Sequence, residues 1–297
     1  MRSRTRGVSI RITVTEVAGL IRSHLPFSAL GNCVLPFLAS LYDRIPRYSS
    51  ERSATLAVRH LPDIIFAGPA GAGKSTQMNL LARELRARGL KVKTARFSSG
   101  HLLAHLLTVV LVNLFRTRKG GLSPLRALVE GSPHLFRKLF RFWLLLDVLS
   151  AYTIFLFRIY IPHKLGYQII IEQYIPNTVV DYVYLFKMLK LPSEKASHWT
   201  GAVERLIQLA LPRKAVFLDS DMSDLQSRWT QRRFHHLGEM PYYVDMQRKV
   251  LPGLIKSLLD CALLRINTTN DRGLTINATH QNIMKFLTKP TIERTSL

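Results

Sequence analysis

Gly68-Pro69-Ala70-Gly71-Ala72-Gly73-Lys74-Ser75 is the stretch that decides the fold of this 297-residue chain. It matches the pattern G-x-x-x-x-G-K-[ST], in which glycines let the backbone point several N–H groups at one phosphate. An apolar run over residues 63–67 predicts a short buried strand before it, and leucines at helical spacing predict a helix over residues 76–85 after it. Strand, loop and helix together predict a nucleotide-binding loop, named the phosphate loop below.

The phosphate loop also predicts ATP and Mg²⁺ as cofactors. Lys74 is expected to reach the outer phosphates as a catalytic residue, and Ser75 to place its hydroxyl on the metal ion. The positive N-terminal end of the following helix adds to phosphate binding. We expect ATP to contact Gly68, Gly71, Ala72, Gly73, Lys74, Ser75 and Thr76. The loop leaves the reaction itself open.

The composition describes a strongly basic chain with a sizeable core. Its formal charge is +23, from 42 Lys and Arg against 19 Asp and Glu, and 47% of its residues are hydrophobic. Such a surface attracts polyanions. The basic residues are spread along the chain and form no recognition motif for RNA or DNA, so we favour a charged, solvated surface over dedicated nucleic-acid binding.

The sequence favours a cytoplasmic location. Cys33 and Cys261 are too few and too far apart for a disulfide framework or a metal-ligand cluster. Arg11 and Glu16 interrupt the apolar core that a signal peptide would need.

Two apolar stretches could be membrane segments by composition: His101–Phe115 and Phe142–Phe157. Each is shorter than the roughly 20 residues that span a bilayer, and the second contains Asp147. We therefore expect buried helices of a globular core. Peripheral contact with an anionic membrane stays open as an alternative, because basic residues flank both stretches: Arg116, Arg118, Lys119, Arg137, Lys138 and Arg141.

The chain is expected to comprise a helical or partly disordered extension (1–60), one catalytic domain (61–290) and a short tail (291–297). Apolar runs that alternate with helical patterns predict a three-layer α/β fold with a mostly parallel five-stranded sheet. The strands are expected at 63–67, 91–97, 167–174, 215–219 and 263–268. Ligands should gather at the carboxyl ends of these strands.

Charged residues stand where two of these strands end. Glu172 follows the third strand and is a candidate metal ligand and catalytic carboxylate. Asp219 follows the fourth strand, where it could support the metal, hold the phosphate loop in place or have only a structural role. One helix later come three arginines that could close over the transferring phosphates or form a solvated basic face: Arg228, Arg232 and Arg233.

With these residues placed, the chain resembles the thymidylate kinase branch of the phosphate-loop nucleoside monophosphate kinases. The family pattern F-E-G-x-D-G-x-G-K-[ST]-T-Q corresponds to residues 66–77, and D-R-Y corresponds to Glu172-Gln173-Tyr174. Leu218-Asp219 and the arginines after it correspond to the strand ending in L-D and to the arginine-containing lid. The resemblance covers roughly residues 61–290.

The resemblance implies a P-loop kinase fold that transfers the γ-phosphoryl of ATP to a nucleoside monophosphate, most simply thymidylate. It implies catalytic roles for Lys74, Glu172, Arg228 and Arg232, and nucleotide binding by Arg233. It implies an acceptor site at Arg96, Gln173 and Tyr174, a metal site at Ser75, Glu172 and Asp219, and a homodimer.

The chain departs from the family at four positions: Ala67 and Ala70 replace acidic loop residues, and Gln173 and Val148 replace arginines. Two alternatives therefore stay open. One is a kinase with a different acceptor, such as a deoxynucleoside or a small phosphorylated metabolite. The other is a non-catalytic nucleotide-binding switch that acts on membranes or nucleic acid.

Overall fold

The computed structural model describes residues 63–115, 124–192, 194–204, 206, 212–231, 241–259, 261–269 and 275–288, without the side chains of residues 126, 194–198 and 241. These residues fall within the expected catalytic domain. The predicted extension (1–60) and tail (291–297) lie outside the described residues.

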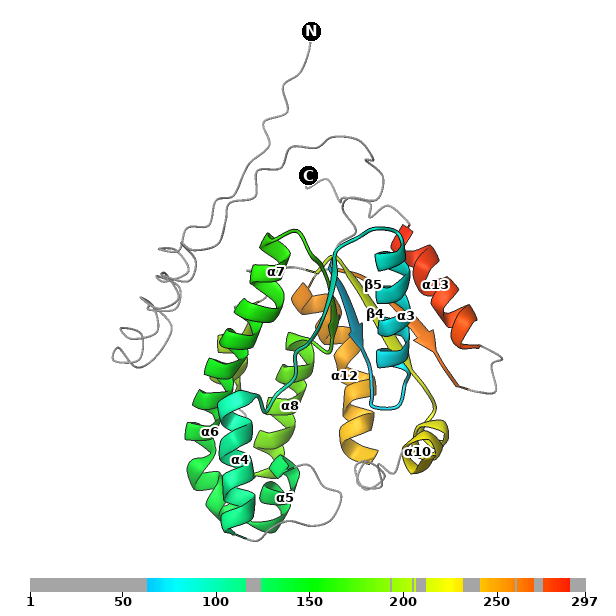
Figure 1. Cartoon of the computed structure of the whole chain (residues 1–297). Helices are drawn as coiled ribbons and strands as arrows, with labels where there is room; N and C mark the ends of the chain where they lie inside the picture. The colour runs from blue at the N-terminus through cyan, green and yellow to red at the C-terminus, as the bar shows by residue number, and fades with distance from the viewer. Residues whose placement is uncertain are drawn as a thin grey trace, which may run out of the picture. The chain divides into compact units, whose positions relative to one another are not determined.

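The described chain folds around one five-stranded sheet (Figure 1). The strand order is β2-β3-β1-β4-β5, and all four neighbouring pairs are parallel. The predicted α/β class is confirmed, and the sheet is entirely parallel. The strands are β1 (Ile64–Ala67), β2 (Val92–Arg96), β3 (Gln168–Glu172), β4 (Lys214–Asp219) and β5 (Ala262–Asn267).

The register of the sheet brings three sequence-distant strand ends to one edge. Phe66 of β1 lies opposite Glu172 of β3, and Glu172 lies opposite Arg96 of β2. Because the strands are parallel, the segments that follow them leave the sheet on the same side. The phosphate loop, which follows β1, therefore starts beside Glu172.

One face of the sheet is covered by α3 (Lys74–Ala87) and α13 (Ile276–Thr288), which pack against each other (Figure 1). Alternate residues of a strand point to opposite faces, and Ile64 and Phe66 point to this one. They are fully buried in a cluster that includes Leu81 of α3 and Ile283 of α13. The start of α3 is thereby fixed relative to the sheet.

The other face carries a larger layer of helices, and Ile65 and Ala67 of β1 point into its core. The longest helix is α6, which continues without a break through η1 and α7. The layer contains α4 (Leu102–Leu114), α5 (Pro124–Gly131), α6 (Pro133–Ile154), η1 (Phe155–Tyr160), α7 (Ile161–Lys164), α8 (Ile175–Met188), α9 (Glu194–Glu204) and α12 (Pro241–Leu259). A further helix, α10 (Met222–Gln231), follows β4.

Within the described residues, one helix, Pro133–Lys164, is long and apolar enough to cross a membrane by length and composition alone. Half of its most apolar window is buried inside the fold. The side chains of Trp143, Leu144 and Val148 belong to the core under the sheet. This segment therefore packs as the core helix that the sequence predicted for Phe142–Phe157.

The expected burial of His101–Phe115 is wrong for the outward side of this helix. Four residues of α4 are buried, Ala104, Thr108, Leu111 and Val112. Leu106 and Leu114, by contrast, are 60% and 68% exposed. The reason is position: α4 lies at the edge of the layer, where its inner side packs on α5 and α6 and its outer side meets no further helix of the described chain.

Candidate active site

The backbone of the phosphate loop has a shape that only glycine accommodates at two positions. Gly68, Gly71 and Gly73 all have positive φ, at 131°, 87° and 91°. A Cβ on Gly68 would lie 1.9 Å from the carbonyl oxygen of Leu218, and one on Gly71 would lie 2.8 Å from Nε1 of Trp229. The loop thus turns tightly against β4 and α10, as a backbone cradle for an anion requires.

Lys74 is the first residue of α3 and is buried at the centre of the loop. Its Nζ donates a hydrogen bond of 2.7 Å to the carbonyl oxygen of Pro69. The ammonium group is therefore held across the loop, where it adds a positive charge to the N-terminal end of the helix.

Ser75 and Glu172 meet in space although 97 positions separate them. The Ser75 hydroxyl donates to Oε1 of Glu172 at 2.7 Å. Magnesium prefers oxygen ligands and is usually bound through one or two protein groups together with substrate phosphates. Among the described residues no group of three His, Cys, Asp or Glu side chains could hold a metal alone. This oxygen pair beside the loop therefore fits Mg²⁺ bound together with a nucleotide.

Arg228 and Trp229 attach α10 to the phosphate loop. The guanidinium of Arg228 donates to the carbonyl oxygens of Gly71, at 3.1 Å, and Thr268, at 2.6 Å. Nε1 of Trp229 donates to the carbonyl oxygen of Ala70 at 2.8 Å. The structure thus places Arg228 as a support of the loop backbone. The helical spacing of the arginines gave no indication of this contact, nor of the role of Trp229.

Arg232 and Arg233 lie outside the described residues, so their expected roles at the phosphates stay predictions.

Asp219 has a different neighbour from the one expected. Its Oδ1 accepts hydrogen bonds from Nε of Arg248, at 2.7 Å, and from the backbone N–H of Ser220, at 2.9 Å. Asp221 lies 3.9 Å from the same arginine, and the Asp219 hydrogen bond is the main cause of a raised Arg248 pKa. The carboxylate is therefore engaged by α12, and a direct metal-binding role for Asp219 has no support in this geometry.

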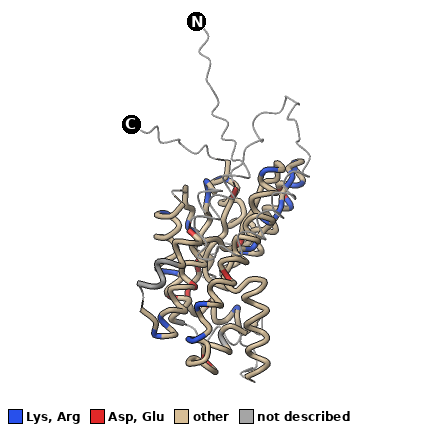
Figure 2. The backbone as a smooth tube through the Cα atoms, turned by 90° about the vertical axis from the view of Figure 1, so that its left-hand side faces the viewer, with Lys and Arg blue, Asp and Glu red and all other residues tan. Residues whose placement is uncertain are grey.

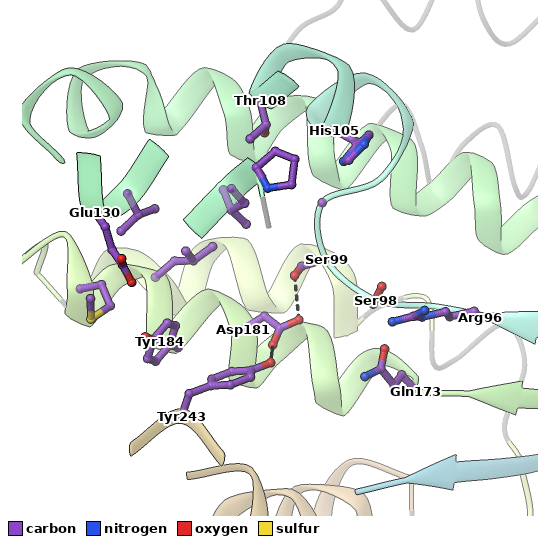
Figure 3. A pocket seen from close by; sticks show the side chains of 16 residues that line it. Arg96, Ser98, Ser99, His105, Thr108, Glu130, Gln173, Asp181, Tyr184 and Tyr243 are labelled. Atoms are coloured by element: carbon purple, nitrogen blue, oxygen red, sulfur yellow. Dashed lines mark hydrogen bonds between the residues drawn. The ribbon is translucent and has the colours of Figure 1, made fainter. Parts of the chain in front are cut away.

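A pocket of about 370 Å³ opens next to Glu172 (Figure 3). Arg96 and Gln173, the neighbours of Glu172 across and along the sheet, form one end of it. The other end is mostly apolar. Its lining includes Arg96, Ser98, Ser99, His105, Thr108, Leu125, Val129, Gln173, Asp181, Tyr184, Leu185, Met188 and Tyr243.

Gln173 sits in a strained conformation at the mouth of this pocket. It has a φ of 58°, and its backbone N–H donates to the carbonyl oxygen of Phe66 at 2.9 Å. Its side-chain Oε1 is buried and accepts no hydrogen bond from the described residues. A buried polar atom without a partner costs free energy unless a ligand supplies one. Gln173 and Arg96 both line the pocket, and their expected roles in acceptor binding stay predictions.

Tyr174 does not share that position. It is fully buried, its ring packs edge-on against Phe97, and burial raises its pKa above the ordinary range. It also forms the N-terminal cap of α8, where its N–H donates to Asn177. The structure therefore places Tyr174 behind the pocket wall and not in its lining.

Two carboxylates hold the wall of the pocket: the half-buried Asp181 lines it, and the fully buried Asp147 binds the backbone of Gly100, which also lines it. Asp181 accepts hydrogen bonds from Ser99, at 2.7 Å, and from Tyr243, and burial raises its pKa. Asp147 accepts from the backbone N–H groups of Gly100 and His101 and from Tyr182. Burial raises the pKa of Asp147 to about 7, against the lowering effect of these hydrogen bonds. Both aspartates lie in otherwise apolar segments of the sequence. A single carboxylate in such a segment is the sequence feature that could have indicated buried hydrogen-bond partners.

No protein-family model matches the chain, and no curated protein matches it significantly in sequence. Solved structures similar to it include the thymidylate kinase from Candida albicans, at 14% identity and a TM-score of 0.46 over 76% of this chain and 90% of that one. Another is the thymidylate kinase from Ehrlichia chaffeensis, at 19% identity and a TM-score of 0.44 over 77% of this chain and 98% of that one. Likeness at this level carries no argument about activity, which has to come from the site.

Proposed function

We propose that this protein is an ATP-dependent phosphotransferase whose acceptor is a nucleoside monophosphate, most simply thymidylate. One arrangement carries the proposal: Glu172, hydrogen-bonded to Ser75 of the phosphate loop, directly adjoins the pocket residues Arg96 and Gln173. A donor site and an acceptor site thus meet at one carboxylate, which is the geometry that phosphoryl transfer needs.

Each group has a task in this proposal. Bound ATP with Mg²⁺ supplies the phosphoryl group. The loop amides and Lys74 hold phosphates, and Ser75 and Glu172 offer oxygen ligands to the metal. Arg96 presents an exposed guanidinium to the acceptor's own phosphate, since arginine binds phosphate through two parallel hydrogen bonds.

The lid arginines complete the proposed site. Arg232 and Arg233 directly follow α10 in the sequence, and α10 contacts the loop, so we expect these two arginines to act on the phosphates. Positive charge there would offset the negative charge that develops during transfer. The homodimer and the cytoplasmic location expected from the sequence stay predictions.

The test is ADP formation by the full chain with ATP and Mg²⁺ across nucleoside monophosphates, deoxynucleosides and small phosphorylated metabolites. Lys74→Ala removes the buried ammonium group and should reduce turnover by at least about 100-fold, as expected when a preorganised charge is lost. Lys285→Ala, which alters an exposed lysine on α13, is the matched control and should leave turnover unchanged.

The outcomes separate the alternatives. Turnover that depends on Lys74 with thymidylate supports the proposal, and turnover with another acceptor keeps the kinase but changes its substrate. Tight ATP binding without turnover on any acceptor would instead favour the nucleotide-binding switch.

A further inference from the structure

The outward side of α4 is mostly apolar, although His105 and Asn113 are also exposed on this helix. Of the fourteen large hydrophobic side chains that are exposed in the described chain, six lie at residues 102–115. Positions 102, 106, 110 and 114 follow one another at intervals of four, so they share one side of the helix. The six residues are Leu102, Leu103, Leu106, Val110, Leu114 and Phe115. Such concentration on one helix marks an interaction site.

The neighbouring helix α6 extends this surface. The indole of Trp143 in α6 donates a hydrogen bond to Thr108 of α4, and Leu103 of α4 donates to Ser150 of α6. The two helices therefore run antiparallel and side by side. Phe142, which precedes Trp143, is 53% exposed and lies on the stretch of α6 that packs beside α4. The seven residues together are called the α4 patch below.

The exposed charges of α4 and α6 have one sign. Lys138 and Arg141 are exposed on α6 close to Phe142. The only acidic residue in α4 or α6 is Asp147, and it is fully buried. Figure 2 views the molecule from the side on which α6 and α7 lie, with lysine and arginine in blue. The patch thus combines exposed leucines with two exposed cations of α6, and the exposed carboxylate of Glu130 lies on α5, where it lines the pocket.

We propose that the α4 patch docks the protein on the surface of an anionic lipid bilayer. Apolar side chains that enter the acyl boundary and basic side chains that contact headgroups are the two parts of interfacial binding. A helix of 13 residues cannot span a bilayer of about 30 Å, so α4 lies in the plane of the surface.

The positive charge of the protein favours a membrane over a second copy of the chain as the partner of the α4 patch. Each copy carries a formal charge of +23, so joining two copies through a patch flanked by Lys138 and Arg141 brings like charges together. An anionic bilayer supplies the complementary charge. This inference is independent of the proposed phosphotransfer.

The test is flotation of the full chain with vesicles of phosphatidylcholine and phosphatidylglycerol. The variant Leu106→Asp/Val110→Asp places charges on two side chains that are 60% and 51% exposed, so the core is not altered. It should reduce the ratio of bound to free protein by at least about tenfold, because buried apolar area is lost and charge enters the interface. Ile276→Asp, at an equally exposed residue of α13, is the matched control and should float like the unmodified chain.

A second variant tests the electrostatic part. Lys138→Glu/Arg141→Glu should weaken binding to the anionic vesicles, while pure phosphatidylcholine vesicles should bind the unmodified chain weakly. Circular dichroism of each variant shows whether the fold is retained.

Three results would overturn the proposal. The first is that the unmodified chain fails to float with anionic vesicles. The second is that the Leu106→Asp/Val110→Asp variant floats as well as the unmodified chain. The third is that the unmodified chain does not bind vesicles but forms a dimer in light scattering, and that the Leu106→Asp/Val110→Asp variant does not form this dimer. The patch would then be a contact between two copies of the chain.

Discussion

At the scale of single residues, the carbonyl oxygen of Leu218 fixes the identity of Gly68. The space for a side chain is already occupied by the backbone of β4, and the φ of 131° is one that other residues rarely adopt. The restriction is therefore both steric and conformational.

Gly68→Ala should lower the free energy of unfolding by at least about 3 kcal/mol, since a contact of 1.9 Å forces either the loop or β4 to move. Gly89→Ala is the control, because Gly89 also has a positive φ, of 82°, but has nothing within 4 Å of an added Cβ. That change should cost only about 1 kcal/mol of backbone strain. Thermal unfolding followed by circular dichroism measures both, and equal losses would contradict the steric argument.

Asp147 makes stability depend on pH. Its pKa is about 7 in the folded protein because burial disfavours the charged form, whereas an exposed Asp titrates near 3.8. A group whose pKa is raised on folding binds protons more tightly in the folded state, so it favours folding at low pH and loses this contribution as pH rises from about 4 through 7.

Asp147→Asn removes this titration while its side-chain oxygen can still accept from the N–H groups of Gly100 and His101. The variant should therefore gain stability relative to the unmodified chain as pH rises from 5 to 8, by at most about 3 kcal/mol. Asp245→Asn, at an exposed aspartate of α12, should show no such trend. Melting temperatures across this pH range measure the difference, and parallel curves for all three proteins would refute the raised pKa.

At the scale of elements, α10 is the helix that positions the phosphate loop. Two of its consecutive side chains donate to two consecutive loop carbonyls, those of Ala70 and Gly71. The same helix leads directly to the predicted lid. A displacement of α10 would therefore change the position of the loop.

Trp229→Phe removes the hydrogen bond to Ala70 and leaves part of a fully packed space empty. We expect ATP affinity to fall by about five- to tenfold, which corresponds to the loss of one hydrogen bond of about 1 kcal/mol. Trp199→Phe, on α9 away from the loop, should leave the affinity unchanged. Calorimetric titration with ATP distinguishes the two, and unchanged binding by both variants would mean that α10 does not position the loop.

At the scale of the whole molecule, the sheet and the loop were predictable because they depend on local sequence. The strand candidates, several of which are continuous apolar runs, match all five strands to within two residues, and the glycine pattern identified the loop. Parallel topology also predicted that Glu172, at the end of its strand, would lie beside the phosphate loop, and its carboxylate does accept a hydrogen bond from Ser75 there. These features need no knowledge of distant side chains.

The partners of individual charges could not be predicted in the same way. Arg248 engages Asp219 from a helix 29 positions later, and Arg228 turns toward backbone carbonyls that helical spacing does not reveal. The exposure of α4 was missed for another reason. The helix is apolar on all sides, so its sequence has no periodicity that distinguishes the inner from the outer side.

The contact between Trp229 and Ala70 also gives the protein an intrinsic optical probe. The emission of an indole responds to the polarity and charge around it, and this indole donates its N–H directly to the loop that is expected to receive ATP. Trp143 and Trp199 lie on α6 and α9, in the other helical layer. Nucleotide occupancy should therefore change the light emitted by one tryptophan of three, so that binding can be followed in the unlabelled chain in real time.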